Sequence, residues 1–446
     1  MIQHLPEDLR DRILDVTDPE SRAQLRLVSH ALKLAVDRRT QSLRWTGGKM
    51  LVRDVRGAAR CTAALNISVR GGGKRARHDG EPGGGGGGAP GCKNKISRSV
   101  LGALSTLRMP LLTWIDLSGN AARAGTLDAG MKVFARGDWP LLAALDLSGC
   151  GLTGEGARHL AAGAWPRLRA LALSDNPLGP DGVGWIAQVS TGLRGLVLDG
   201  CRLGDRGAAA LAAAAAGVPN VKRLHLSRND ISGTGLIALA GGRGTWKHLS
   251  HLEFNTNFLG HVGDAAAPPT CPWPLRALTL DYTHVGTFAT MVAAMPATLT
   301  RLSLKNAMTY DPDDPDPAPA AASAFTAGLD TLDLSFNSPR VMWHVLVGRE
   351  WPRLKALTLR GLDDETMLEL FMGDTRFPAL ETLDARSSPN NELALGTWMV
   401  LLEDSETRFP KLRAFFGTSK YPQTRTQLVP RFNASREVQT VFQWTV

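Results

Sequence analysis

The 446-residue sequence lacks long apolar runs and metal-binding cysteine motifs, and both absences exclude classes of protein. No stretch of about 18 uncharged apolar residues occurs, so no membrane-spanning helix is expected. The N-terminus has no basic-then-apolar pattern, so no export signal is expected. The five cysteines, at positions 61, 92, 150, 201 and 271, are odd in number and match no Cys-x-x-Cys or Cys/His spacing. We therefore expect an intracellular protein in a reducing compartment, without a metal site.

Catalytic motifs are also missing. The sequence contains no nucleophile elbow, no His-Glu-x-x-His and no carboxylate pair with a positional rationale. A run of six glycines lacks the Gly-x-x-x-x-Gly-Lys-Ser/Thr spacing of a phosphate-binding loop. The net charge of +9 is small for this length and argues only weakly for a nucleic-acid partner. We expect a binding protein that is not an enzyme and has no cofactor.

One segment of the chain is repeated along most of its length. WPRLRALALSDNPLG from Trp165 returns as WPRLKALTLRGLDDE from Trp351, and aligning the chain on Leu-x-x-Leu-x-Leu gives twelve units, the last degenerate. Their first positions, 24 to 32 residues apart, are Leu112, Leu142, Leu168, Leu193, Val221, Leu249, Leu275, Leu299, Leu329, Leu354, Leu380 and Leu412. Self-similarity at such a period predicts a solenoid.

Each position of the unit has a physical role. In Leu-x-Leu the two leucines point to one side of a short parallel strand, and the flanking residues point to the other side. The eighth residue after the first Leu is small and polar and can bond backbone groups left unpaired where the chain leaves the strand. These residues are Asn120, Cys150, Asn176, Cys201, Asn229, Asn257, Thr283 and Asn337. Leu362 and Ser388 follow, so the last repeats should be less regular.

Helices are predicted between the strands. Segments such as LTGEGARHLAAGA and LGDRGAAALAAAAAG begin with a Gly-rich polar turn and continue with apolar residues at helical spacing. An aromatic residue followed by proline then ends the segment, because proline disfavours helix in the residue before it. These pairs are Trp139-Pro140, Trp165-Pro166, Trp273-Pro274, Trp351-Pro352, Phe377-Pro378 and Phe409-Pro410.

The whole pattern resembles the leucine-rich repeats of the ribonuclease-inhibitor type, over roughly residues 105 to 420. The resemblance implies an α/β solenoid, a right-handed horseshoe with parallel strands on the concave face and helices on the convex face. It also implies that Cys150 and Cys201 are structural residues of the polar ladder.

The N-terminal 45 residues resemble an F-box. The resemblance rests on Leu5-Pro6-Glu7-Asp8-Leu9 with Ile13-Leu14, a break near Pro19, and Leu25-Arg26-Leu27-Val28-Ser29 with Leu32. Pro6 suits the start of a helix, with Glu7 and Asp8 in its first turn. Many F-boxes carry Trp shortly after Val-Ser, where this sequence has Ala31-Leu32. The alternative interpretation is a helical cap that shields the edge of the first repeat, as solenoids require.

An F-box protein with leucine-rich repeats is expected to be the substrate-recognition subunit of a cullin-based (SCF-type) ubiquitin ligase. A Skp-type adaptor would bind the F-box-like segment, and the repeats would bind a protein substrate. The adaptor-binding residues implied are Leu5, Pro6, Leu9, Ile13, Leu14, Leu27, Val28 and Leu32. The alternative is a cytoskeletal, ciliary or inhibitor-type scaffold without a ubiquitin role. The expected location is cytoplasmic or nuclear, or for the alternative, the ciliary axoneme or cytoskeleton.

The predicted domains follow from composition. They are the F-box-like helical segment 1–45, a connecting segment 46–69 that could form a first strand, a Gly-rich basic linker 70–96, the repeats 97–425 and a C-terminal cap 426–446. Residues 70–91 cannot bury enough apolar surface to fold and should form a flexible loop. Lys74–Arg77 resembles a nuclear-import signal, but short basic clusters are common by chance, and a plain solvated linker is the favoured interpretation. An acidic, Pro-rich insertion at 309–323 should form an extended loop.

A ligand would bind beside the buried leucines, on the exposed side of the strands. The candidate residues there are Trp114, Arg223, His225, His251, Glu253, Arg301, Lys305, Arg360 and Arg386. Trp114 is the one large aromatic residue among them, and aromatic and Arg side chains tend to dominate interface energetics. Asp116, Asp146 and Asp333 occupy equivalent positions, but in Asp-Leu-Ser they could equally support the turn. A face with charges of both signs favours a protein or peptide partner.

Overall fold

The computed structural model describes residues 42–44, 64–66, 96, 98–106, 112–120, 124–241, 246–259, 271–285, 295–308, 319–361, 364–372, 374–386 and 409–417. The chain divides into two compact units. The first contains Met1–Asp230 and Gly241–Leu249, and the second contains Ile231–Ala240 and Ser250–Val446.

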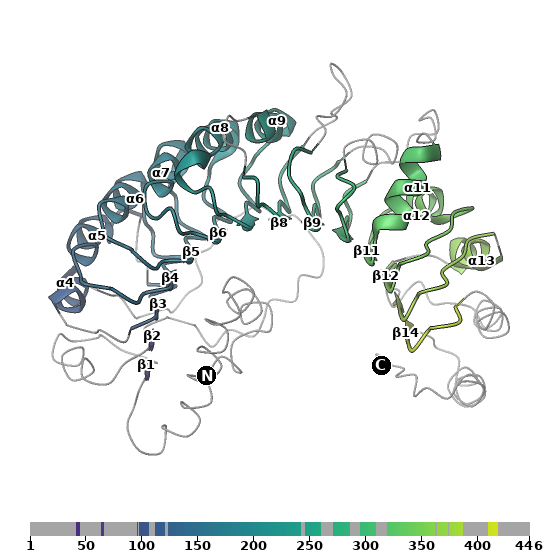
Figure 1. Cartoon of the computed structure of the whole chain (residues 1–446), viewed down its shortest axis with the longest axis horizontal. Helices are drawn as coiled ribbons and strands as arrows, with labels where there is room; N and C mark the ends of the chain where they lie inside the picture. Colours follow the sequence, from purple (N-terminus) through teal and green to yellow (C-terminus); the bar gives the residue numbers. More distant parts are fainter. Residues whose placement is uncertain are drawn as a thin grey trace. The chain divides into compact units, whose positions relative to one another are not determined.

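The first unit is a row of parallel strands with helices along one side (Figure 1). Its strands pair in chain order: β1 (Ser42–Arg44), β2 (Ala64–Asn66), β3 (Trp114–Asp116), β4 (Ala144–Asp146), β5 (Ala170–Ala172), β6 (Gly195–Val197) and β7 (Arg223–His225). Its helices pack against one another in sequence: α4 (Arg98–Thr106), α5 (Asp128–Phe134), α6 (Gly154–Ala161), α7 (Gly179–Ile186) and α8 (Gly204–Ala214), which ends in the 3-10 turn η2 (Ala215–Gly217).

The second unit repeats this plan. Its parallel strands are β8 (His251–Glu253), β9 (Ala277–Thr279), β10 (Arg301–Ser303), β11 (Thr331–Asp333), β12 (Ala356–Thr358), β13 (Thr382–Ala385) and β14 (Ala414–Gly417). Its described helices are α11 (Pro319–Gly328), α12 (Pro339–Leu346) and α13 (Asp364–Met372), and nearly all of α9 (Gly233–Gly241) belongs to this unit. The predicted α/β repeat solenoid is confirmed.

The paired leucines form the core in both units. The middle residue of each strand from β3 onward is buried and faces its equivalent in the next strand, as Leu145 faces Leu171 and Leu171 faces Leu196. The second unit continues in the same manner from Leu252 to Phe415. Burying each such side chain stabilises the fold by roughly 1.5–3 kcal/mol. The inward direction predicted for Leu-x-Leu is therefore correct.

The aromatic-Pro pairs form the turns that return the chain to the next strand. In WPRL the amide of Leu168 donates to the carbonyl of Trp165 at 3.3 Å, and Leu354 bonds Trp351 likewise at 3.4 Å. The indole of Trp165 is buried and donates from Nε1 to the carbonyl of Leu160 at 3.0 Å, at the end of α6. Trp165 thus ties the end of α6 to the start of the next strand, and Trp139 Nε1 likewise donates to the carbonyl of Phe134 at the end of α5.

One residue in each unit of the repeat adopts a left-handed backbone. It stands seven residues after the first Leu, just before the polar ladder position. From the first to the tenth unit these residues are Gly119, Gly149, Asp175, Gly200, Arg228, Thr256, Tyr282, Asn306, Phe336 and Gly361, with φ between 44° and 85°. Glycine, aspartate and asparagine tolerate this region, whereas the β-branched Thr256 and the bulky Tyr282 and Phe336 are outliers.

Two expectations about element boundaries are wrong. Residues 42–44 were predicted as the end of an all-helical segment, but they form β1, which pairs with β2 in register Leu43 to Leu65. Pairing satisfies the backbone groups at the sheet edge, which a helix end would leave open. The acidic insertion was expected to remain a loop to residue 323, yet α11 begins at Pro319, because Pro at a helix start followed by alanines favours a helix.

Candidate functional site

The side chains at the second, fourth and sixth positions after the first Leu point away from the core, and we call them the outer strand face. All nine candidate ligand-binding residues occupy these positions. In the first unit, however, Trp114 is only 8% exposed and packs against Ala144 and Ala170. His225 is 5% exposed, and Arg223 is half-buried. The indole of Trp114 therefore presents little surface to a partner.

The aspartates of the outer strand face hold the turn after the strand. Asp116 accepts the amide hydrogen of Ser118 at 2.9 Å, and Asp146 accepts that of Ser148 at 2.9 Å. In the second unit, Asp333 accepts from both the amide (3.0 Å) and the hydroxyl (2.6 Å) of Ser335. The structural interpretation of Asp-Leu-Ser is therefore correct for these three residues.

The outer strand face of the second unit carries a network of charged side chains. Arg301, which is exposed, donates to Nε2 of His251 at 3.1 Å. Lys305 lies between two carboxylates, 3.7 Å from Asp281 and 3.3 Å from Asp333. Burial lowers the pKa of Lys305, but the two aspartates outweigh it and raise that pKa above its ordinary value.

Two arginines of this network share one carboxylate. Asp384 binds Arg360 at 2.8 Å and Arg386 at 2.6 Å, and the Arg386 guanidinium also lies over the ring of Phe416, 5.4 Å from its centre. Burial raises the pKa of Asp384, but hydrogen bonds from Arg386 and Arg360 outweigh it and hold that pKa below its ordinary value. Glu253, the remaining candidate in this unit, is half-buried. Six of the nine predicted ligand-binding residues thus lie on the outer strand face of the second unit.

Exposed aromatic side chains follow three strands of the second unit, and none of them was predicted from the sequence. Phe258, Tyr282 and Phe336 are 67%, 46% and 50% exposed. Phe258 meets the ring of His284 edge-on, with centroids 6.1 Å apart. Tyr282 and Phe336 hold the left-handed position of their repeats, where no other aligned unit places an aromatic residue. That departure from the repeat pattern, one residue before the ladder, could have revealed them.

The polar ladder is structural. Asn176 is fully buried, and its Oδ1 accepts the amides of Cys150 (3.0 Å) and Leu152 (2.9 Å). Its Nδ2 donates to the carbonyls of Leu147 and Leu173 at 2.9 and 2.8 Å. Burial raises the pKa of both Cys150 and Cys201 to about 12. A buried thiol with such a raised pKa forms little thiolate at neutral pH, so neither cysteine is a reactive nucleophile there.

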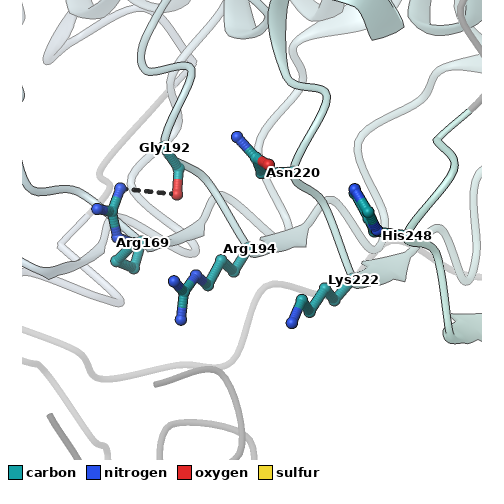
Figure 2. A pocket seen from close by; sticks show the side chains of 6 residues that line it. All are labelled: Arg169, Gly192, Arg194, Asn220, Lys222 and His248. Carbon is teal, nitrogen blue, oxygen red and sulfur yellow. Dashed lines mark hydrogen bonds between the residues drawn. The ribbon is translucent and has the colours of Figure 1, made fainter. Parts of the chain in front are cut away.

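A shallow depression of about 300 Å³ lies at the amino ends of the strands in the first unit (Figure 2). Its lining residues are Arg169, Gly192, Arg194, Asn220, Lys222 and His248. No described lining residue carries a carboxylate. These cations are not among the residues predicted to bind a ligand, because they stand before the strand residues and not on the outer strand face.

The adaptor-binding residues proposed from the sequence, Leu5 to Leu32, lie outside the described residues, as do Lys74–Arg77. Within the described ranges, no helix is long and apolar enough to cross a membrane. The same part of the chain contains no group of three or more His, Cys, Asp or Glu side chains placed to hold a metal ion.

Comparison with known families agrees with the repeat fold. A family model described as Leucine Rich repeat matches residues 140–161, 190–212 and 219–240. A search of curated proteins found no match. Such repeats usually serve as binding scaffolds, because short parallel strands present a row of outward side chains on a rigid support. The chain therefore contains leucine-rich repeats arranged as an α/β repeat solenoid, an architecture typical of protein–protein interaction.

Proposed function

We propose that this protein is the substrate-recognition subunit of an SCF-type ubiquitin ligase. In this proposal the N-terminal segment binds a Skp-type adaptor, the repeats bind a protein substrate, and the chain itself performs no catalysis. The F-box-like sequence of residues 1–45 supports the first part. The leucine-rich repeats support the second. Such a protein would act in the cytoplasm or the nucleus.

The observation that carries the substrate-binding part is the charged network on the outer strand face of the second unit. Its residues do not fill the core, and they replace the Asp-x-Ser pattern seen in the first unit with cations such as Lys305 and Arg360. A partner that carries both positive and negative groups fits this face. Complementary charges orient such a partner and speed its association more than they raise its affinity. The exposed rings of Phe258, Tyr282 and Phe336 supply apolar contact area beside it.

Adaptor binding is tested by co-purification. Leu9→Asp and Ile13→Asp place a charge on the apolar side of the predicted N-terminal helix and should abolish recovery of a Skp-type adaptor. Asp11→Lys, on the opposite side of the same helix, is the control and should leave recovery unchanged. Retained adaptor in both apolar-side variants would refute the adaptor role.

Substrate binding is tested with the full chain and proximity labelling in cells. Arg301→Glu reverses an exposed charge in the network and should remove a set of labelled proteins. Arg206→Glu, an exposed position on α8, makes the same charge change elsewhere and should not. If both variants label the same proteins as the unaltered chain, this face does not select the substrate.

One observation favours the scaffold without a ubiquitin role. Residues 42–44, at the end of the F-box-like segment, form β1 and extend the sheet beyond β2. A segment that belongs to the sheet serves as a cap for the repeats. Removal of residues 1–41 distinguishes the two roles. A cap predicts a lower unfolding midpoint for the whole chain, whereas a docking module predicts an unchanged midpoint with loss of the adaptor.

A further inference from the structure

We propose that the basic depression of the first unit binds an acidic, extended segment of a partner protein. Arg169, Arg194 and Lys222 occupy the same position in consecutive repeats, each directly after the first Leu or Val. The amide of Lys222 donates to the carbonyl of Arg194, and that of Arg194 to Arg169, both at 2.8 Å. Three cations therefore stand in a row across three adjacent strands.

The spacing of the row follows from the sheet. Neighbouring strands lie about 4.8 Å apart, so the backbone positions of Arg169 and Lys222 are separated by about 10 Å. An extended peptide places side chains of one face about 6.7 Å apart. Two or three acidic side chains of such a segment can therefore reach the row. The equivalent residues in the preceding repeats, Thr113 and Ala143, are uncharged, so the row begins at Arg169.

Arg169 is held in place by the next repeat. Its Nη1 donates to the carbonyl of Gly192 at 3.0 Å, and Figure 2 shows this bond across the depression. A Cβ on Gly192 would lie only 1.9 Å from the same nitrogen. Only glycine leaves room for the guanidinium there. The lack of a side chain at residue 192 therefore allows Arg169 to line one side of the depression.

The lining selects the chemistry of the ligand. The three cationic side chains lie next to one another in Figure 2, with Asn220 and His248 beside them. Guanidinium groups bind carboxylate and phosphate oxygens with paired hydrogen bonds, and Lys adds a point charge. The depression is shallow and its described lining is polar, unlike the apolar pockets that hold small molecules. Carboxylates on Asp or Glu side chains fit it, and a phosphorylated side chain has the same oxyanion chemistry.

The inference is independent of the adaptor role, because the depression belongs to the repeats of the first unit. It also concerns a different surface from the charged network of the second unit. Loss of binding here would leave adaptor recovery unchanged, so the two proposals can fail separately.

The test uses the purified full chain and fluorescein-labelled hexaglutamate, followed by fluorescence anisotropy at about 0.05 M salt. Hexaglutamine is the neutral probe, and a peptide with two phosphoserines distinguishes phosphate from carboxylate. We expect hexaglutamate to bind and hexaglutamine not to bind. A phosphopeptide that binds more than tenfold tighter would identify the phosphorylated side chain as the source of the oxyanion.

Variants locate the site. Arg194→Glu and Lys222→Glu should each weaken hexaglutamate binding about tenfold, which corresponds to about 1.4 kcal/mol. Gly192→Ala keeps every charge but displaces the Arg169 guanidinium, and should weaken binding severalfold. Arg206→Glu on α8 changes the net charge as much as Arg194→Glu and should have little effect. Circular dichroism at increasing temperature verifies that each variant is folded.

Three results would overturn the proposal. An equal loss in Arg206→Glu would mean that net charge and not the depression binds the peptide. Unchanged binding in folded Lys222→Glu and Gly192→Ala would place the peptide elsewhere. The third result is a single-stranded oligothymidine that binds more tightly than either acidic peptide and whose binding is lost in the same variants. It would mean that the ligand is a nucleic acid and not a protein segment.

Discussion

The side-chain oxygen of Asn176 accepts the backbone amide of Cys150, one repeat earlier in the chain, at 3.0 Å. This bond satisfies a buried donor that the strand pairing leaves open, and the same oxygen accepts the amide of Leu152. In the next repeats, Asn229 accepts the amide of Cys201 at 2.8 Å. The repeats are therefore joined at the turns by side-chain amides as well as by strand pairing.

Removing one of these amides should destabilise the fold. Asn176→Ala leaves buried donors and acceptors without partners, and we expect a loss of about 3 kcal/mol in the free energy of unfolding. Asn220→Ala is the control, because its side chain is exposed and makes a single bond, to the carbonyl of Thr191 at 3.0 Å. It should cost less than about 0.5 kcal/mol. Urea unfolding measures both, and equal midpoints would contradict the structural role of the ladder.

The shared carboxylate of Asp384 should contribute a specific dependence of stability on pH. Because the pKa of Asp384 is lowered in the folded state, its stabilisation is present above the unfolded value of about 3.9 and is lost as pH falls through the folded value. We expect Asp384→Asn to lose stability at neutral pH and to lose less at about pH 3, below the unfolded pKa, where part of this stabilisation is already gone. Urea unfolding at both pH values provides the test. Asp181→Asn, an exposed site on α7, is the control, and a pH-independent loss in Asp384→Asn would contradict the prediction.

The ladder cysteines should resist alkylation in the folded protein. Their thiols are buried and their pKa values are raised to about 12, so almost no thiolate forms at about pH 8.5. With iodoacetamide, Cys271, which is half-buried, should be modified before Cys150 and Cys201. Urea should make all three react at similar rates. Peptide mass spectrometry records the order, and rapid native labelling of Cys150 would place its thiol at the surface.

The left-handed backbone at Tyr282 should make glycine the more stable residue there. Tyr282→Gly and Tyr282→Ala remove the same exposed ring, but only glycine relieves the strain of φ 59°. We expect the glycine variant to be about 1 kcal/mol more stable than the alanine variant. Thermal unfolding of the two measures this difference. If alanine is equally stable, the backbone at residue 282 is not left-handed in solution.

If Tyr282 contributes to partner binding, both variants should also lose labelled proteins in the proximity assay. A strained residue kept at an exposed position is consistent with a binding role, since strain concentrates at functional sites. If labelling is unchanged in Tyr282→Ala, Tyr282 has no role in partner binding and serves only in the turn.

Much of the fold could be read from the repeat. The spacing of Leu142, Leu145 and Leu147 fixes which side chains are buried, because a strand alternates its faces every residue. The helices of LTGEGARHLAAGA and LGDRGAAALAAAAAG follow from helical spacing and appear as α6 and α8. The boundaries of helices and strands do not follow from the repeat alone. For example, β1 forms because it pairs with β2 and not because of its own three residues.

The sequence predicts where the outward side chains of the candidate site lie on each repeat, but not which of them are exposed to solvent. Alternation placed Trp114 and Arg301 on the same face, yet Trp114 is covered by Ala144 and Ala170 whereas Arg301 is exposed. The basic depression depends on the contact between Arg169 and Gly192, 23 residues apart. Local sequence does not show such a contact.

The sequence by itself determined the repeat, its inward leucines and its polar ladder, because these follow from periodicities that each repeat contains. The tertiary structure alone decided which outward side chains reach solvent, which cations share a carboxylate and where a depression forms. Those properties depend on the side chains that adjacent repeats bring together, and stacking places residues about 25 positions apart side by side. Burial and charge pairing therefore arise between repeats and not within them.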